Sequence, residues 1–264
     1  MKRKIQLLGI LFLMLIIFLG CSDAQKSAEK SSPKDAEVTI YLARHGKTML
    51  NTTQRVQGWA DSPLTDEGIT GARNLGKGLE KAGIDFDAVY SSDLGRAKQT
   101  AVEVLDAKNQ SLKIQEQQGL REICFGKYEG ELVSKMWDDM AQSMGYQNQE
   151  QLNQAINKGQ TTTAAAYDAM AQLDDMGMAE DYKTVQTRME KTMIEIADKA
   201  LETGDENVLV VSHGVAIGAL LTELTDDYNG QGLSNASICK LSYKNGNFKV
   251  ESINDTSYVK NGAN

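Results

Sequence analysis

The sequence contains five residues whose side chains suit chemistry on an anion: Arg44, His45, Arg96, Glu122 and His213. Arginine is permanently charged and planar, and its guanidinium matches a phosphate group with two parallel hydrogen bonds. A neutral imidazole is a competent nucleophile whose pKa lies near working pH. Several cations would stabilise the charge on a phosphoryl group during its displacement, and a carboxyl group would protonate the departing oxygen. Together these residues would suffice for phosphoryl transfer through a phosphohistidine without a metal.

The two histidines of the chain occupy equivalent positions. His45 and His213 each come after an apolar run, over residues 38–43 and 207–212, and each precedes a glycine. An uncharged run of this kind is typical of a buried parallel strand. Open α/β sheets bind ligands at the carboxyl ends of such strands. If the two strands are neighbours, the two histidines meet at one edge of the sheet.

Helices alternate with strands along the rest of the chain. Apolar spacing, caps and turn residues predict helices over residues 65–82, 94–105, 182–201 and 215–224, strands over 86–90 and 113–116, and a hairpin over 238–253. The alternation predicts an α/β fold, a three-layer sandwich whose mostly parallel central sheet has helices on both faces. We expect the tail after Tyr258 to fray.

The composition changes over residues 131–181, which are rich in Met, Gln, Ala and Asp. The stretch is helical in pattern, with irregular breaks, and a polar loop is expected earlier, over residues 49–61. We interpret residues 131–181 as a cap inserted over the sheet of a single folded domain, which spans residues 38–258.

The first 20 residues have the pattern of a secretory signal peptide, with three basic residues followed by an apolar run. Cys21 follows a small residue, as in a bacterial lipobox, so lipid attachment to its sulfur would leave the protein anchored to the cell membrane. The alternative is an uncleaved signal anchor, since the apolar run is about long enough to span a thin bilayer. Residues 21–37 are polar and read as a flexible tether. Either way the folded domain is expected outside the cytoplasm.

The charge of the chain limits its partners. Its formal net charge is −8, and the leader carries basic residues and no acidic ones, so the remainder is more acidic still. A surface of this sign argues against nucleic acid as a partner. An anion-binding site must therefore be a local cluster of arginines.

Two cysteines follow the leader, Cys124 and Cys239, and the sequence leaves open whether they form a disulfide or stay as buried thiols.

Five stretches, in this order, resemble the motifs of the histidine phosphatase superfamily, the phosphoglycerate mutase-like group. They are Leu-Ala-Arg-His-Gly-Lys-Thr at 42–48, Gln-Gly-Trp-Ala-Asp-Ser-Pro-Leu-Thr at 57–65, Ser-Ser-Asp-Leu-Gly-Arg-Ala-Lys-Gln-Thr-Ala at 91–101, Leu-Arg-Glu at 120–122 with Phe-Gly and Glu-Gly after it, and Val-Ser-His-Gly at 211–214. Together they extend over nearly the whole folded part.

The resemblance implies a role for each matched residue. His45 would be the nucleophile that accepts the phosphoryl group, and Glu122 would protonate the leaving group and then help to activate water. The family needs no metal or organic cofactor, and its partner is a small phosphorylated substrate. The implied phosphate-binding residues are Arg44, Asn51, Arg96 and His213, and the implied substrate loop contains Gln57, Gly58 and Trp59.

Two positions depart from the family pattern. Lys47 stands where glutamate is more common, and Ala-Glu-Asp at 179–181 stands where Gly-Glu-Ser is common. Neither departure removes a reacting group, but both positions can change the pocket. We read Glu180 as a solvated helix cap.

Three functions fit the sequence. The first is an extracytoplasmic, membrane-anchored hydrolase of small phosphomonoesters that acts through phospho-His45. The second is a phosphoglycerate mutase-type transferase, which has the same nucleophile but returns the phosphoryl group to a bound intermediate. The third is a phosphate- or phosphoester-binding lipoprotein without turnover. The natural substrate depends on the cap and on Trp59, and neither carries a readable code.

Overall fold

The structure is a computed structural model that describes residues 36–264. The expected signal peptide, the lipidation site Cys21 and most of the expected tether lie outside the described residues. Within residues 36–264, no helix combines the length and the apolar character that a membrane span requires.

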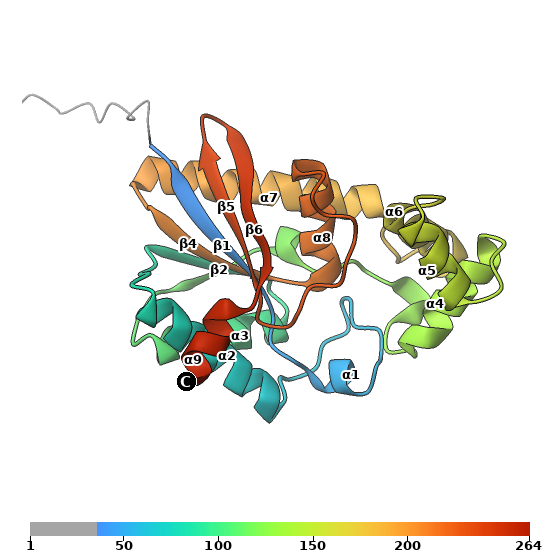
Figure 1. Cartoon of the computed structure of the whole chain (residues 1–264), viewed down its shortest axis with the longest axis horizontal. Helices are drawn as coiled ribbons and strands as arrows, with labels where there is room; N and C mark the ends of the chain where they lie inside the picture. Colours follow the sequence, from blue (N-terminus) through green and yellow to red (C-terminus); the bar gives the residue numbers. More distant parts are fainter. Residues whose placement is uncertain (1–35) are drawn as a thin grey trace, which may run out of the picture. The chain divides into compact units, whose positions relative to one another are not determined.

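A six-stranded sheet forms the centre of the fold, in the order β3-β2-β4-β1-β5-β6 (Figure 1). Its strands are β1 (Val38–Arg44), β2 (Ala88–Ser91), β3 (Ile114–Glu116), β4 (Asn207–Ser212), β5 (Ile238–Lys244) and β6 (Asn247–Asp255). The first four strands of that order are parallel, and the hairpin of β5 and β6 continues the sheet in antiparallel fashion. Arg44 at the end of β1 lies opposite Ser212 at the end of β4. The two histidines therefore leave neighbouring strands at the same edge, as the sequence predicts.

Helices cover both faces of the sheet and form the expected three layers. The helices of the described residues are α1 (Met49–Thr52), α2 (Asp66–Lys81), α3 (Gly95–Ala107), α4 (Val133–Ser143), α5 (Gln149–Asn157), α6 (Thr163–Leu173), α7 (Tyr182–Thr203), α8 (Gly214–Leu224) and α9 (Ser257–Ala263), with short 3₁₀ turns at Gln118–Leu120 and Gly126–Tyr128. Helices α7 and α8 pack on one face, and α2, α3 and α9 pack on the other.

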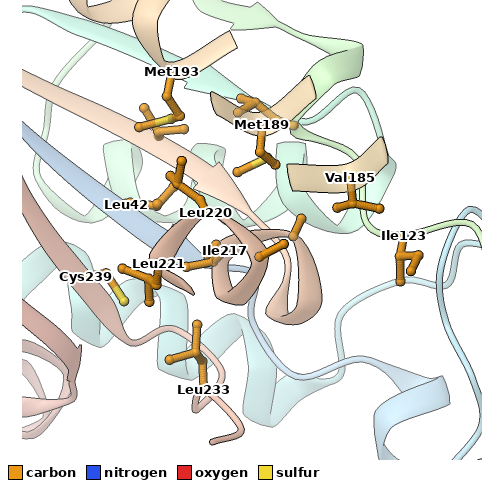
Figure 2. Close-up of a cluster of buried hydrophobic side chains, with 14 of the residues drawn as sticks. Leu42, Ile123, Val185, Met189, Met193, Ile217, Leu220, Leu221, Leu233 and Cys239 are labelled. Carbon is orange, nitrogen blue, oxygen red and sulfur yellow. The ribbon is translucent and has the colours of Figure 1, made fainter. Parts of the chain in front are cut away.

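Each central strand divides its side chains between the two cores, because successive residues of a strand point to opposite faces. Leu42 of β1 lies in the core beneath α7 and α8, and Ala43 lies in the core beneath α2 and α3. Figure 2 shows Leu42 beside Leu220 of α8, with Met193 and Met189 of α7 above them in the view. All four of these apolar side chains are fully buried. The end of β1, which carries Arg44, is thus anchored from both sides.

The two cysteines within the described residues are separate free thiols. Cys124 and Cys239 are both buried, and Cys239 belongs to the core shown in Figure 2. Burial raises the pKa of the Cys239 thiol to about 11, so it is protonated at neutral pH. Of the two states that the sequence leaves open, the structure has the free thiols.

The expectation that the tail frays after Tyr258 is wrong. Residues Ser257–Ala263 form α9, which packs along α2. Two glycines permit this close contact. A Cβ at Gly78 would lie 1.9 Å from the Tyr258 carbonyl oxygen, and one at Gly262 would lie 1.8 Å from that of Asn74. Backbone-to-backbone packing of this kind leaves no apolar periodicity in the sequence of the tail.

The composition change at residues 131–181 corresponds to the helices α4, α5 and α6, which follow one another along this stretch (Figure 1). Asp174, just after α6, fixes the end of this stretch to the loop that carries Glu122. Its carboxylate accepts backbone N–H bonds from Lys127 at 3.0 Å and from Ala179 at 2.8 Å. The polar loop expected over 49–61 differs in one respect, because its first residues form the short helix α1, which Thr48 caps.

Candidate active site

His45 is held at the end of β1 by both its backbone and its ring. Its backbone N–H donates to the Ser212 carbonyl at 3.0 Å. Its ring Nδ1 lies 2.7 Å from the Gly46 carbonyl oxygen. Because a carbonyl can only accept, this contact places the ring hydrogen on Nδ1 and leaves the lone pair on Nε2. His45 is only 3% exposed, and it lines the cavity described below.

His213 lies beside His45, with 5.2 Å between the ring centroids. It caps the start of α8 with its backbone, and its side chain is fully buried. Neither ring nitrogen has a hydrogen-bond partner among the described residues. Buried polar atoms are rarely left without partners, so both nitrogens point to a group that the protein itself does not supply.

Arg96 is completely buried on α3. One of its terminal nitrogens donates to the Gly58 carbonyl at 2.7 Å and the other contacts Asp61 at 3.0 Å, while its Nε has no hydrogen-bond partner among the described residues. Arg44 has a similar arrangement. Its Nη1 donates to the Leu233 carbonyl, and its buried Nε has no such partner. Arg44 lies close to Gly214, the residue after His213. A Cβ added at Gly214 would lie 3.3 Å from the Arg44 Nε.

These groups shape one another's ionisation. Burial holds the pKa of His45 well below its usual range, and the charges of Arg96 and Arg44 lower it further. Burial also lowers the pKa of His213 strongly, again with help from Arg96. Both imidazoles are therefore neutral at physiological pH, and a neutral imidazole is the nucleophilic form.

Glu122 meets the start of α8 and is only 5% exposed. Its carboxylate accepts backbone N–H bonds from Val215 at 3.0 Å, from Ala216 at 2.8 Å and from Ile123 at 3.0 Å. The first two donors belong to the first turn of a helix, where free N–H groups favour an anionic partner. Glu122 is thus a positioned carboxylate rather than a solvated loop residue.

The loop that carries Glu122 is held by an arginine that sequence reasoning missed. Arg188 of α7 donates to the carbonyls of Gly119, Arg121 and Glu122 at 3.0, 2.6 and 2.8 Å. The same guanidinium forms a two-pronged ion pair with Glu180, both contacts being 2.8 Å. Glu180 is therefore not a solvated helix cap, because it is paired and Asp181 caps α7 instead. No family motif quoted from the sequence contained Arg188.

The predicted substrate loop packs against the Glu122 loop through a second residue that sequence reasoning missed. The carboxylate of Glu129 accepts backbone N–H bonds from Gly58, Trp59 and Ala60 at 2.9–3.1 Å. The Trp59 indole donates to the Glu122 carbonyl at 3.0 Å, and the ring is 42% exposed. Trp59 thus contacts the loop of Glu122. The sequence feature that marks Glu129 is the Glu-Gly pair at residues 129–130, which follows Leu-Arg-Glu in the family motif.

Asn51 and Gln57 are two further polar residues that line the cavity around His45. The Asn51 side chain accepts from the Thr48 backbone N–H at 3.2 Å, so it is a helix-capping residue that also lines the cavity. The Gln57 side chain accepts from the Thr48 hydroxyl at 2.6 Å. Asn235, which sequence reasoning missed, donates to the His45 carbonyl at 3.0 Å and contacts the Asn51 oxygen at 3.3 Å.

The two departures from the family pattern lie away from the cavity around His45. Lys47 pairs with Glu67 at 2.6 Å on the surface, and neither side chain lines that cavity. The residues 179–181 do not line it either, although Glu180 acts on the Glu122 loop through Arg188. The expectation that Lys47 changes the pocket is therefore not supported by its position.

A cavity of about 240 Å³ opens over these groups. The predicted site residues that line it are Arg44, His45, Asn51, Gln57 and Glu122. Arg96 and His213 are fully buried and, like Trp59, do not line the cavity. Within residues 36–264, no three His, Cys, Asp or Glu side chains are grouped so that they could hold a metal ion.

Comparison with known proteins identifies the family of the chain. The family model described as histidine phosphatase superfamily (branch 1) matches residues 40–256. A crystal structure of a phosphoglycerate mutase from Bacillus anthracis is 40% identical, with a TM-score of 0.81, over 86% of this chain and 97% of that one. A protein from Yersinia pestis described as a probable phosphoglycerate mutase, GpmB, is 27% identical over 83% of this chain and 94% of its own length.

A third comparison shows that a phosphatase has the same fold as this chain. The structure of phosphoserine phosphatase from Entamoeba histolytica has a TM-score of 0.61 over 84% of this chain and 99% of that one. At 23% identity, this likeness shows a common fold only. Since the family model covers most of the chain, the protein belongs to branch 1 of the histidine phosphatase superfamily.

Proposed function

We propose that the protein hydrolyses small phosphomonoesters through a phosphohistidine at His45, without a metal or organic cofactor. The observation that carries the proposal is a set of four buried polar atoms near His45 without hydrogen-bond partners among the described residues. They are Nε of Arg44, Nε of Arg96, and both ring nitrogens of His213. A phosphoryl group carries several acceptor oxygens, which would accept from the two arginine Nε–H groups and from the one N–H of the neutral His213 ring, and would benefit from both positive charges.

In the first step, the Nε2 lone pair of His45 attacks phosphorus while the bond to the leaving oxygen breaks. The arginines Arg44 and Arg96 stabilise the charge on the phosphoryl oxygens. The electron pair of the broken bond goes to the leaving oxygen, which takes the proton that Glu122 must carry, as the carboxylic acid, at the start of the cycle. The Nδ1–H contact with Gly46 supports this assignment, because it leaves Nε2 as the free ring nitrogen.

In the second step, water attacks the phosphorus of phospho-His45. Glu122, now a carboxylate, takes a proton from that water, and the bond between phosphorus and Nε2 breaks. The products are inorganic phosphate and neutral His45, so protons and electrons balance over the cycle. The position of Glu122 at the cavity wall supports its use in both steps.

The second candidate is a phosphoglycerate mutase activity. It is favoured by the 40% identity to the phosphoglycerate mutase from Bacillus anthracis. A mutase uses the same nucleophile but returns the phosphoryl group to the bound product instead of releasing it to water. The expected export of this chain argues for hydrolysis, because glycolytic intermediates are cytoplasmic.

The test is an assay of phosphate release from an aryl phosphate by the full chain in detergent, with EDTA present. We expect turnover by the wild type and a loss of at least about 1,000-fold in His45→Ala, because the nucleophile is removed. Circular dichroism checks that the variant is folded. Undiminished turnover in folded His45→Ala would overturn the mechanism.

A mutase assay on the same samples separates the two candidates. Mutase turnover that exceeds hydrolysis at equal enzyme concentration would establish the second candidate instead of the first. Phosphate binding by calorimetry, without turnover of any ester, would indicate the non-catalytic binding protein.

We further propose that the protein acts at the extracytoplasmic surface of the cell membrane, anchored by lipid on Cys21. The support is the signal-peptide pattern and the small residue before Cys21 in the sequence. Metabolic labelling with a fatty acid should mark the wild type and leave Cys21→Ser unlabelled. Equal labelling of both would contradict the lipidation site.

A further inference from the structure

The cavity around His45 has two chemically different walls. The polar groups come mainly from the sheet edge and its adjoining loops, whereas the aromatic lining comes from the cap, the start of α7 and two loops. Its aromatic residues are Phe125, Trp137, Tyr167, Tyr182 and Tyr228, and we call them the aromatic wall. Four of these five side chains are at most 8% exposed, and Trp137 is half-buried.

Four rings of the aromatic wall, all except Tyr228, pack against one another. Tyr167 stacks on Tyr182, with 6.0 Å between centroids and 8° between planes. Trp137 and Phe125 meet Tyr167 at 5.9 and 6.2 Å, with their planes tilted by 64° and 60°. Such packing holds each ring in place, so the surface that faces the cavity exists before a ligand arrives.

The polar ends of two tyrosines are used within the protein. The Tyr228 hydroxyl donates to the Gln231 carbonyl at 2.6 Å, and the Tyr182 hydroxyl lies 3.2 Å from that of Thr222. These hydroxyls are therefore already paired, and what the two residues offer the cavity is mainly ring surface. Flat apolar surface of this kind binds another aromatic ring by stacking or edge contact.

The cavity offers little for a second anionic group. Besides Arg44 and Glu122, the only charged residue of the described chain that lines it is Arg55. The Arg55 side chain is exposed and donates to the Gly130 carbonyl at 2.8 Å. A carboxylate placed against the aromatic wall would lose its hydration without a buried counter-charge, which is unfavourable.

We propose that the aromatic wall binds an uncharged aromatic leaving group, so that the substrates are phosphomonoesters of aromatic alcohols or phenols rather than of hydroxy acids. This inference rests on the proposed function, because it assumes that the phosphate lies at His45 and the leaving group extends toward the cap. Because 3-phosphoglycerate has a leaving group with a carboxylate and no aromatic ring, we expect poor activity toward it.

The test compares two phosphonates, which resemble the ester but cannot be hydrolysed. Calorimetry on the full chain in detergent measures the dissociation constants of benzylphosphonate and methylphosphonate. Both ligands carry the same anionic group, so the ratio of their affinities isolates the aromatic wall. We expect benzylphosphonate to bind the wild type at least about tenfold more tightly. Trp137→Leu should reduce this ratio about three- to tenfold, the range expected for one aromatic contact.

Two further variants keep the test decisive. Met178→Ala removes an exposed apolar side chain that follows α6 and does not line the cavity, so it should leave the ratio unchanged. Tyr167→Leu replaces the central ring of the aromatic wall and should reduce the ratio if Trp137→Leu does not fold. A ratio near one in the wild type would overturn the proposal, and so would an unchanged ratio in both folded wall variants.

Turnover distinguishes a failure of this inference from a failure of the proposed function. Hydrolysis of phenyl phosphate and 3-phosphoglycerate with equal kcat/KM would overturn the aromatic leaving-group site and leave the phosphatase intact. Preferential binding of benzylphosphonate without hydrolysis of any ester would support the site and overturn the phosphatase. Binding of neither phosphonate would overturn both.

Discussion

Gly58 shows how a single residue sets the geometry of the phosphate-binding groups. Its carbonyl accepts from Arg96 at 2.7 Å, and its Cα faces the Glu122 loop. A Cβ at this position would lie 2.2 Å from the Ile123 carbonyl oxygen and 2.3 Å from a Glu129 oxygen. Contacts this short require the substrate loop to move away from the Glu122 loop, and Arg96 would lose the carbonyl that orients it.

We therefore expect Gly58→Ala to reduce kcat/KM by about 100-fold, the cost of a displacement of about 1 Å at a reacting centre. Overpacking should also lower the free energy of unfolding by about 1–3 kcal/mol. Steady-state kinetics and thermal unfolding measure the two effects. Gly71→Ala is the matched control, because its Cβ would meet only the Ala236 Cβ at 4.0 Å. Gly71 lies in α2, so alanine there should be neutral or stabilising. A loss of activity in Gly71→Ala equal to that in Gly58→Ala would contradict this account.

Whether a residue of the site could be predicted from the sequence depends on how far along the chain its hydrogen-bond partners lie. His45, Arg96 and Glu122 could be predicted because each lies in a short stretch whose residue types already suggest its chemistry. Arg188 and Asn235 could not, since their importance comes from hydrogen bonds to backbone carbonyls 66 and 190 positions away. A single arginine on an amphipathic helix carries no sign of such partners. Trp59 is an intermediate case. The sequence predicted its place in the substrate loop but not its hydrogen bond to the Glu122 carbonyl.

At the scale of elements, α7 positions the Glu122 loop through Arg188. Arg188 does not line the cavity, so it is a positioning residue. Arg188→Lys keeps the charge but loses the planar fork that spans Glu180 and three carbonyls. We expect kcat to fall about 10- to 100-fold, because Glu122 would no longer be held at the leaving oxygen. The affinity for inorganic phosphate, measured by calorimetry, should change little.

The dependence on the leaving group separates positioning from a general structural defect. A leaving group of low pKa, such as nitrophenol, needs little help from an acid, whereas benzyl alcohol needs it. Arg188→Lys should therefore lower turnover of benzyl phosphate far more than that of nitrophenyl phosphate. Arg73→Lys, at an exposed pair with Glu103, is the matched control and should affect neither substrate. Equal losses on both substrates in Arg188→Lys would argue against the positioning role.

Elements with strong periodicity were predictable, and elements defined by close backbone contact were not. Residues 38–43 of β1 and all of β4 carry no charged side chain, and α7 has regular apolar spacing that ends at Gly204, which adopts φ 81°. Helix α9 has no such pattern, because its contact with α2 depends on the absence of side chains at Gly78 and Gly262. The cap was recognisable from its composition, but the mutual packing of Trp137, Tyr167 and Tyr182 depends on contacts between α4, α6 and α7.

At the scale of the whole molecule, the two histidines link the folding of the domain to pH. The chain has no others, and both are buried with their pKa values held well below the usual range. Below about pH 6.5, the unfolded chain takes up protons on these imidazoles that the folded protein does not. Stability therefore rises with pH across this window, and it is lost as pH falls below about 6.5.

The stability of the full chain in detergent should accordingly fall between pH 7 and pH 5.5. The loss is at most about 1.4 kcal/mol per pH unit for each histidine, and the thermal unfolding midpoint measures it. Replacing both residues, as His45→Gln with His213→Gln, should flatten the profile in this range, because glutamine does not titrate. Saturating inorganic phosphate should also reduce the slope, since a bound anion favours the protonated imidazoles. A flat profile in the ligand-free wild type, or an unchanged slope in the double variant, would show that the buried histidine pair does not control this dependence.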